Sequence, residues 1–263
     1  MNILRLDELF VKQGLSTYRR TRRYLQEHEV LVNSERVLEA GFVIDVRHDE
    51  LCIDGSVYPL QSEIYLMMNK RQDTVCTTDE GWHERVFESI DERFLHPKGL
   101  GKLHAVGRLD LDTEGLLLLT TDGKLSHRLT DPKTHSSKTY LVYLRDYCSP
   151  EDRIRYTEIF SKGVKVAPEK KSPEFTAEPA VLTWYDENNI CEIEKYCTIF
   201  GAEMTFCTLT VTEGKFHQVK RMFRAMGNEV IFLKRIAIGS LRLDPSLLPG
   251  EYRELTEREI ENL

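Results

Sequence analysis

The sequence has no long hydrophobic run. None of its apolar stretches reaches the roughly 18 residues that a membrane-spanning helix needs. The opening residues, MNILRLDELF, are too briefly apolar and too early acidic for a secretory signal. We therefore expect no membrane association and a cytoplasmic protein.

Cysteine is present but forms no recognisable pattern. The six cysteines make no C-x-x-C motif and no histidine-paired zinc spacing; they are Cys52, Cys76, Cys148, Cys191, Cys197 and Cys207. In a chain of 263 residues, such scattered cysteines are typical of reduced thiols in the cytosol. The sequence also has no internal repeat and no low-complexity segment. A disulfide scaffold, cysteine catalysis and a repeat architecture are therefore not expected.

Net positive charge is absent too, since the formal net charge is −7. The basic residues are nevertheless concentrated in two islands. Residues 9–26 contain five basic residues and no acid, and residues 215–235 contain six basic residues and one acid, Glu229. A net-acidic protein with basic islands can bind a polyanion locally. Without an acidic partner, the arginines of the first island favour contact with phosphates.

Hydrophobic spacing predicts two domains. Residues 1–60 contain two short helices, the second capped by Ser16 and running to about Glu27, followed by a small sheet. The polar stretch from Gly55 to Glu63 is expected to be a linker to residues 61–263. In that second domain, strands outnumber helices and do not alternate with them regularly, which indicates an α+β fold.

Several elements of the second domain have clear signals. The leucine run 116–119 predicts a buried strand, and residues 190–197 predict another strand. Ser149 followed by Pro150 predicts a helix start. Residues 215–228 predict an amphipathic helix that closes at Gly227 and Asn228.

The stretch GRLDLDTEGLLLLTTDG, residues 107–123, carries two carboxylates beside this leucine strand. Asp110, Asp112, Glu114 and Gly115 fit the start of a calcium loop, but position 12 is Thr121 and no helix follows, so that alternative fails. The D-x-D metal site of a nucleotide-sugar transferase remains possible from spacing alone. So does a purely structural turn.

Beyond this stretch, the segments KTYLV (138–142), EGKFHQVKRMFRAMGNEV (213–230) and LPGEYRELTEREI (248–260) follow in order. Together with GRLDLDT, they resemble the RsuA-type branch of the pseudouridine synthases. Residues 1–60 are similar to the small αL-type RNA-binding domain that commonly precedes this catalytic domain. The resemblance implies a pseudouridine synthase fold, with a central, mainly antiparallel sheet in two halves and flanking helices.

The resemblance also implies residue roles. Asp110 matches the catalytic nucleophile, Tyr140 the active-site tyrosine, and Lys220 the basic partner of the carboxylate. Asp112 occupies a position that the family pattern leaves free, so we expect it to be solvent-facing or structural. The positions expected to contact RNA are Arg19, Arg20, Arg22, Arg23, Lys70, Arg108, Thr113, Lys215, His217, Gln218 and Arg221. His104 is expected to be structural or close to RNA.

One segment departs from the family pattern. The family typically has Lys-Pro after the first strand of the catalytic domain and a glycine two residues later. Here Lys70 is kept, but Arg71 and Asp73 occupy the other two places. Asp73 is a poor substitute if the turn needs a positive φ.

The expected reaction is the isomerisation of a uridine in ribosomal RNA by a monomer, without metal or organic cofactor. The segment HQVKRMFRAMGNEV (217–230) and the GEYREL ending most resemble the enzyme that modifies uridine 516 of 16S rRNA. We expect this RNA to be bound as part of an assembling small subunit. A 23S rRNA enzyme of the same family and a non-catalytic ribosome-assembly factor are the alternatives. A non-catalytic assembly factor would not need the catalytic residues Asp110, Tyr140 and Lys220, which are all present here.

Overall fold

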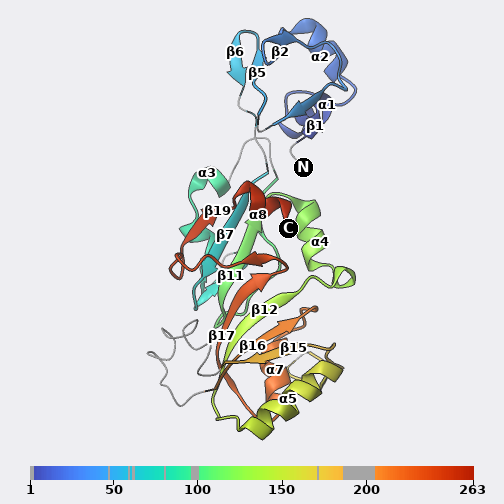
Figure 1. The fold of residues 1–263 in the computed structure, drawn as a ribbon. Coiled ribbons are helices and arrows are strands. Elements are labelled where there is room, and N and C mark those ends of the chain that lie inside the picture. Colours follow the sequence, from blue (N-terminus) through green and yellow to red (C-terminus); the bar gives the residue numbers. More distant parts are fainter. Residues whose placement is uncertain are drawn as a thin grey trace. The chain divides into compact units, whose positions relative to one another are not determined.

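The chain folds into two compact units in the computed structural model, which describes residues 3–46, 48–58, 60, 63–79, 81–95, 101–170, 172–185 and 205–263. One unit comprises Met1–Ile64 with Asp91–Leu103, and the other comprises Tyr65–Ile90 with His104–Leu263 (Figure 1). Each unit has a hydrophobic core of its own. None of the helices in the described ranges is long and apolar enough to cross a membrane.

The first unit packs two helices against short strands. Leu6, Phe10 and Leu25 on the helices are fully buried with Val30 and Leu51 on the strands. The strand order β3-β2-β5-β6 forms one sheet, and β1 pairs with β4. The elements are β1 (Ile3–Arg5), α1 (Leu6–Lys12), α2 (Thr21–Glu27), β2 (Val30–Val32), β3 (Glu35–Arg36), β4 (Val43–Asp45), β5 (Leu51–Ile53), β6 (Ser56–Tyr58) and α3 (Glu92–Leu95).

Two sequence predictions fail in this unit. Helix α2 begins at Thr21, and the Ser16 hydroxyl donates to the Thr17 carbonyl (3.1 Å) instead of capping the helix. The expected linker contains strand β6, which pairs with β5. Asp54 and Gly55 both have positive φ (49° and 78°) and form the tight hairpin turn for which Asp-Gly is a strong signal.

The arginines of the first basic island lie at the surface of this unit. Arg19 and Arg20 precede α2, Arg22 and Arg23 lie within it, and all four are exposed. Arg23 has an acidic partner one turn later, because its Nε lies 2.7 Å from Glu27 Oε1. The expectation of an unpaired basic face is therefore wrong for Arg23.

Within its described residues, the second unit is built on a nine-stranded sheet. Its main path runs β15-β16-β12-β17-β11-β7-β19, with β10 on β11 and β18 on β17. In the described part of this sheet, β11 and β17 run parallel and the other pairs are antiparallel. The strands are β7 (Tyr65–Lys70), β10 (His104–Ala105), β11 (Glu114–Thr120), β12 (Lys138–Leu144), β15 (Val181–Trp184), β16 (Thr205–Val211), β17 (Val230–Ile238), β18 (Leu241–Arg242) and β19 (Tyr252–Glu254).

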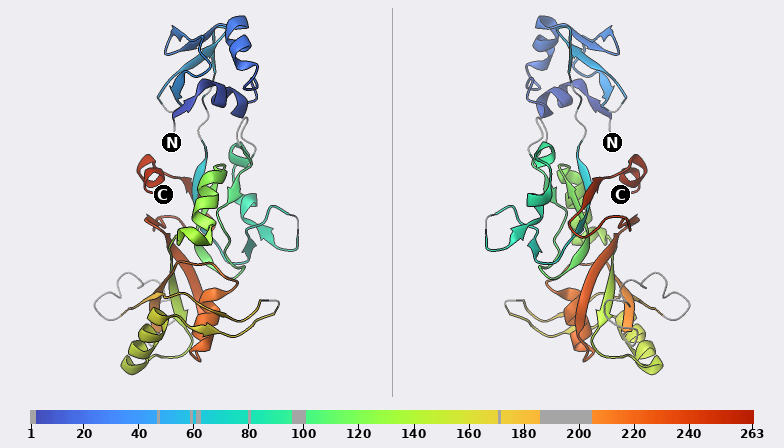
Figure 2. Two further views of the ribbon diagram at one scale, coloured as in Figure 1. Left: turned by 90° about the vertical axis from the view of Figure 1, so that its right-hand side faces the viewer. Right: turned by 90° about the vertical axis from the view of Figure 1, so that its left-hand side faces the viewer.

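Helices cover the two halves of this sheet (Figures 1 and 2). Around β12, β15 and β16, α5 contributes Phe160 and α7 contributes Phe223 to one core. Around β11, α4 contributes Leu125 to a second core. The remaining elements are β8 (Thr74–Val75), β9 (Glu84–Arg85), η1 (Val86–Ser89), α4 (Gly123–Thr130), η2 (Pro132–Thr134), α5 (Pro150–Lys162), β13 (Lys165–Val166), β14 (Phe175–Thr176), α7 (Gln218–Ala225) and α8 (Glu257–Glu261).

Most element predictions for this unit are confirmed. The leucines 116–119 are fully buried in β11. The Ser149 side chain accepts from the Asp152 amide in a capping box at the start of α5, as the Ser-Pro signal predicts. The amphipathic helix is shorter than expected, beginning only at Gln218. The strand predicted for residues 190–197 lies outside the described residues.

A glycine lets β11 and β17 approach each other closely. Gly115 has φ of 104°, and a Cβ there would collide with the backbone carbonyl of Arg235. This close approach fixes the start of β11, and therefore the loop that precedes it, against β17.

The C-terminal segment is held by an arginine between two carboxylates. Arg253 Nε lies 2.7 Å from Asp244 Oδ2, and its Nη2 lies 2.8 Å from Glu259 Oε1. Hydrogen bonds from Arg253 lower the pKa of Glu259 to about 2. Hydrogen bonds from Ser246, together with Arg253, lower the pKa of Asp244 to about 2.

We expect Arg253→Met to lower the free energy of unfolding by about 2 kcal/mol at pH 7, because two partly buried carboxylates lose their partner. A carboxyl whose pKa is lower in the folded than in the unfolded protein stabilises the fold at pH values above its unfolded pKa. For Asp244 and Glu259 this stabilisation is lost as the pH falls toward their folded pKa of about 2. The difference between variant and wild type should therefore shrink in urea titrations at about pH 3. An equal loss at both pH values would contradict this assignment.

Candidate active site

The loop that carries Asp110 is built around a buried lysine. Lys70, at the end of β7, is fully buried. Its Nζ donates to the carbonyls of Asp110 (3.1 Å), Leu111 (3.3 Å) and Thr113 (3.0 Å), and to its neighbour Arg71 (3.0 Å). The Thr113 amide also donates to the Asp110 carbonyl (3.1 Å), which closes a turn. One ammonium therefore fixes the backbone of Asp110 and of the residues that follow it.

This burial contradicts the prediction that Lys70 contacts RNA. Its side chain has no exposed surface, and its donors are directed at backbone carbonyls. Burial also lowers the pKa of Lys70. Lys70 positions the loop and does not face a ligand.

The departure from the family pattern has a visible consequence at Asp73. Its φ is 62°, so the turn does need the left-handed conformation that glycine adopts most readily. Aspartate tolerates this conformation better than most residues. The Asp73 amide donates to the Leu111 carbonyl (2.9 Å), so this turn also supports the Asp110 loop.

We expect Asp73→Gly to raise the free energy of unfolding by about 0.5 kcal/mol, because the left-handed strain is removed while the amide donor stays. Chemical denaturation of the two proteins measures the difference. An Asp73→Ala variant is the control and should be destabilised. A lower stability for the glycine variant would show that the Asp73 side chain matters more than its backbone.

Asp110 and Asp112, the two carboxylates of residues 107–123, share one ammonium. Lys220 Nζ, from α7, lies 3.2 Å from Asp110 Oδ2 and 2.5 Å from Asp112 Oδ1. Asp112 is 67% exposed, as expected of a solvent-facing residue. Its ion pair with Lys220 nevertheless makes it a direct neighbour of the Asp110 pair, which the sequence did not indicate.

This arrangement also bears on the metal alternative. The position between the two carboxylates is already occupied by a lysine cation. Within the described residues, no group of three or more histidine, cysteine or acidic side chains could hold a metal ion.

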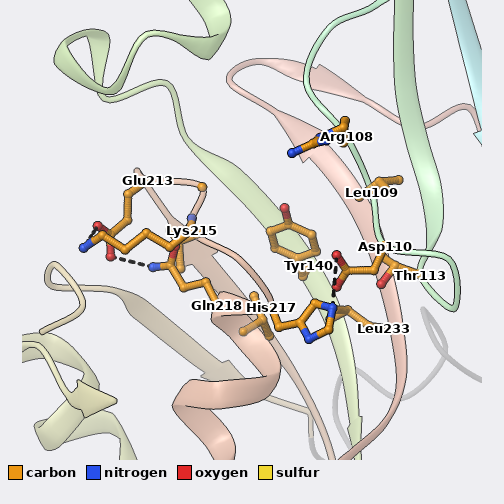
Figure 3. A pocket seen from close by; sticks show the side chains of 13 residues that line it. Arg108, Leu109, Asp110, Thr113, Tyr140, Glu213, Lys215, His217, Gln218 and Leu233 are labelled. Atoms are coloured by element: carbon orange, nitrogen blue, oxygen red, sulfur yellow. Dashed lines mark hydrogen bonds and ion pairs between the residues drawn. The ribbon is translucent and has the colours of Figure 1, made fainter. Parts of the chain in front are cut away.

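Two adjoining cavities open beside Asp110. A small one of about 90 Å³ and a larger one of about 620 Å³ are both lined by Arg108, Asp110, Tyr140 and Lys215. Tyr140 comes from β12, where it lies opposite Leu209 of β16. Figure 3 shows the phenol ring and the carboxylate on the wall of the same pocket. A planar ring from β12 and an acid from the loop before β11 thus line one recess.

His217 is the third group near the acid. Its Nε2 lies 3.9 Å from Asp110 Oδ1 (Figure 3). Its Nδ1 lies 3.3 Å from Glu169 Oε1. His217 and Lys220 therefore face different oxygens of the same carboxylate.

This geometry can be compared with known proteins. A family model described as RNA pseudouridylate synthase matches residues 64–225, more than half of the chain. The chain belongs to this family.

Similarity to individual members extends over almost the whole chain. The synthase is 40% identical to ribosomal small subunit pseudouridine synthase A of Escherichia coli strain K12, covering 98% of both chains. It is 37% identical to the protein of the same name from Haemophilus influenzae, covering 99% of both. A crystal structure of a pseudouridylate synthase aligns with a TM-score of 0.61 at 36% identity, covering 98% of this chain and 99% of that chain. The predicted family and fold class are confirmed.

Three further residues that were expected to contact RNA are buried parts of the synthase's framework. Arg221 is 3% exposed and donates to the carbonyls of Phe216, Ala167 and Pro173. Gln218 is 5% exposed and donates to Glu213 (2.6 Å).

The third, Thr113, is 1% exposed, although it borders the small cavity. Arg221 directs its guanidinium at backbone carbonyls and lines neither cavity, so its prediction is wrong. Gln218 and Thr113 are buried but line the small cavity, so their contact with RNA stays a prediction.

Other predicted positions remain accessible in the synthase. Arg108 is exposed and lines both cavities. Lys215 also lines both, but its Nζ lies 2.6 Å from Glu213 Oε2, so part of its charge is balanced. His104 lies half-buried in β10.

The structure adds two basic residues that the sequence did not single out. Lys138 and Arg235 line the larger cavity of the synthase. Burial, with the charge of Arg235, lowers the pKa of Lys138. Lys138 is the first residue of the KTY segment, two positions before Tyr140. Residues at this spacing in a strand point to the same face, so the sequence did carry a signal that Lys138 lies beside Tyr140.

Proposed function

We propose that this pseudouridine synthase isomerises a uridine of 16S ribosomal RNA, with Asp110 as nucleophile and uridine 516 as the target. The observation that carries the catalytic part is the Asp110–Lys220 ion pair beside Tyr140 in a recess edged by basic residues. The small-subunit target is supported by the names of relatives that are 37–40% identical. We further propose that residues 1–60 bind RNA, that residues 61–263 catalyse, and that a cytoplasmic monomer acts on the assembling small subunit.

The reaction rearranges bonds within one nucleotide. The bond between uracil N1 and the sugar C1′ breaks, the base turns, and C5 bonds to C1′. The proton on C5 then leaves and N1 gains one, so the atoms balance without a redox partner. The groups required are an acid that stays ionised beside the sugar, a surface for the base, and proton transfer.

Each proposed catalytic residue suits one of these tasks. Lys220, 3.2 Å from Asp110 Oδ2, places a positive charge directly beside the carboxylate in a partly enclosed site. The carboxylate can then attack C1′ or assist deprotonation of the sugar while the uracil anion departs. Tyr140 offers a ring face on which a uracil can stack, and a phenol that can relay a proton.

The target uracil must leave the stacked bases of the RNA to reach this recess, which costs roughly a few kcal/mol. Exposed and half-buried cations at the cavity edge can offset part of that cost through phosphate contacts. Arg108, Lys138 and Lys215 line the larger cavity and are the candidates in this unit. Arg19, Arg20, Arg22 and Arg23 are the candidates in the first unit.

The substrate is tested with transcripts. Purified protein is incubated with full-length 16S and 23S rRNA, each as naked RNA and as an assembly intermediate, and pseudouridine is mapped chemically. We expect one mark, at uridine 516 of 16S rRNA. A mark confined to 23S rRNA would overturn the choice of substrate but not the chemistry. Loss of the mark in excess EDTA would support a metal-dependent alternative instead.

A further inference from the structure

His217 is placed between two acids that are distant in sequence. Its ring separates Asp110, at 3.9 Å from Nε2, and Glu169, at 3.3 Å from Nδ1. The Phe216 ring stacks on it with centroids 3.7 Å apart. The His217 side chain is only 22% exposed, so its position is determined by packing as well as by charge.

The backbone at His217 adopts a strained conformation that directs the ring between Asp110 and Glu169. Its φ and ψ are 49° and 29°, a left-handed conformation that is uncommon for a non-glycine residue. This conformation is held by the start of α7, where the Arg221 amide donates to the His217 carbonyl (2.9 Å). Strain of this kind persists where surrounding contacts enforce it, and it is common at functional sites.

Glu169 is itself firmly held. Its Oε2 lies 3.2 Å from Arg224 Nη1 and 4.0 Å from Arg221 Nε, while its Oε1 faces His217. Although burial raises it, contacts with His217 and Arg224 bring the pKa of Glu169 below its ordinary value. Glu169 is therefore an anion that can keep a proton on His217 Nδ1.

We infer that Glu169 and His217 form a positioning pair that fixes the orientation of the Asp110 carboxylate. The inference rests on the proposed function. Lys220 faces Oδ2 of Asp110 and His217 faces Oδ1, so the carboxylate is held at both oxygens. A ring protonated on both nitrogens directs one N–H to Glu169 and the other toward Asp110. At 3.9 Å the second contact is an electrostatic one, and contacts of this kind tighten when substrate closes the site.

Several other charges act on this ring or its partners. Asp112 interacts electrostatically with His217, Lys220 binds both Asp110 and Asp112, and Arg221 and Arg224 approach Glu169. The charged ring thus completes a row in which anions and cations alternate. Loss of its proton would leave Asp110 with Lys220 as its cation, which it shares with Asp112.

The test is the pH dependence of single-turnover pseudouridine formation, with the full chain and saturating 16S rRNA transcript. We expect the wild-type rate to fall with rising pH, because the proposed role requires the charged form of the His217 ring. His217→Asn, which tolerates the left-handed backbone, should lower the rate by roughly 10- to 100-fold and abolish this fall. Glu169→Gln should move the fall to lower pH and lower the neutral-pH rate by about tenfold.

Matched controls separate this role from a structural one. Glu174→Gln makes the same substitution in an exposed ion pair with Lys165 and should leave rate and pH profile unchanged. RNA affinity and thermal unfolding of all variants should match wild type. If Asp110→Asn is inactive while His217→Asn and Glu169→Gln keep the wild-type pH profile, the positioning pair is refuted alone. If Asp110→Asn remains active, the proposed function fails instead.

Discussion

Asp110→Asn is expected to lower the single-turnover rate of pseudouridine formation by at least about 10⁴-fold, because the amide keeps the shape of the side chain and removes the proposed nucleophile. The loop should stay intact, since Lys70 binds the backbone carbonyl of residue 110 rather than its side chain. RNA affinity should therefore change by less than about threefold. The measurement is pseudouridine formed per enzyme on a 16S rRNA transcript, with binding measured in parallel.

Asp112→Asn is the matched control for this variant. It makes the same change two residues away, on the other carboxylate that contacts Lys220. Asp112 is largely exposed, and Lys220 keeps Asp110 as its partner, so we expect the rate to stay within about tenfold of wild type. Equal losses in the two variants would mean that the acidic pair acts as a unit, and that Asp110 alone is not the nucleophile.

Lys70→Met is expected to lower the rate by about 10²-fold and the free energy of unfolding by about 1 to 3 kcal/mol. Methionine keeps most of the buried volume but removes the donor to four carbonyls. Three of these carbonyls keep other donors, since the Asp73 amide donates to Leu111, the Thr113 amide donates to Asp110, and the Thr74 hydroxyl donates to Arg71. Relief from burying a charge offsets a further part of the loss, which is why the stability effect is moderate.

The rate should fall because the loop, once released, no longer fixes Asp110 against its substrate. Urea denaturation and single-turnover kinetics of the same preparation measure the two effects. Lys165→Met replaces an exposed lysine of the same unit and should change unfolding free energy by less than about 0.5 kcal/mol, with no change in rate. A Lys70→Met protein with wild-type kinetics would show that the ammonium does not organise the loop.

Local patterns predicted much of the second unit. The leucine run, the Ser149–Pro150 helix start and the end of the last long helix each depend on residues within one turn or strand of each other. The Asp54–Gly55 hairpin of the first unit also depends on a local signal, the Asp-Gly pair at its turn. Family resemblance then brought Asp110, Tyr140 and Lys220 together, and the structure places all three at one recess or its edge.

What the sequence could not indicate are contacts between distant residues. Lys70 lies 40 residues before Asp110, and no local pattern distinguishes a buried lysine that holds carbonyls from one that binds phosphate. Glu169 lies 48 residues before His217, in a stretch without regular periodicity. Arg221 shares a helix face with buried residues, and its carbonyl partners are fixed by tertiary packing. In each case burial decides the role, and burial is a property of the fold.

The proposed role of Asp110 is to act as the nucleophile when a uridine of 16S rRNA is converted to pseudouridine. The most direct measurement is a chemical map of pseudouridine across both rRNAs, in a strain that lacks its own enzyme and expresses either this protein or its Asp110→Asn variant. We predict a mark at uridine 516 of 16S rRNA with the wild-type protein and none with the variant. An equally complete pseudouridine mark with the Asp110→Asn variant would contradict the proposed role of Asp110.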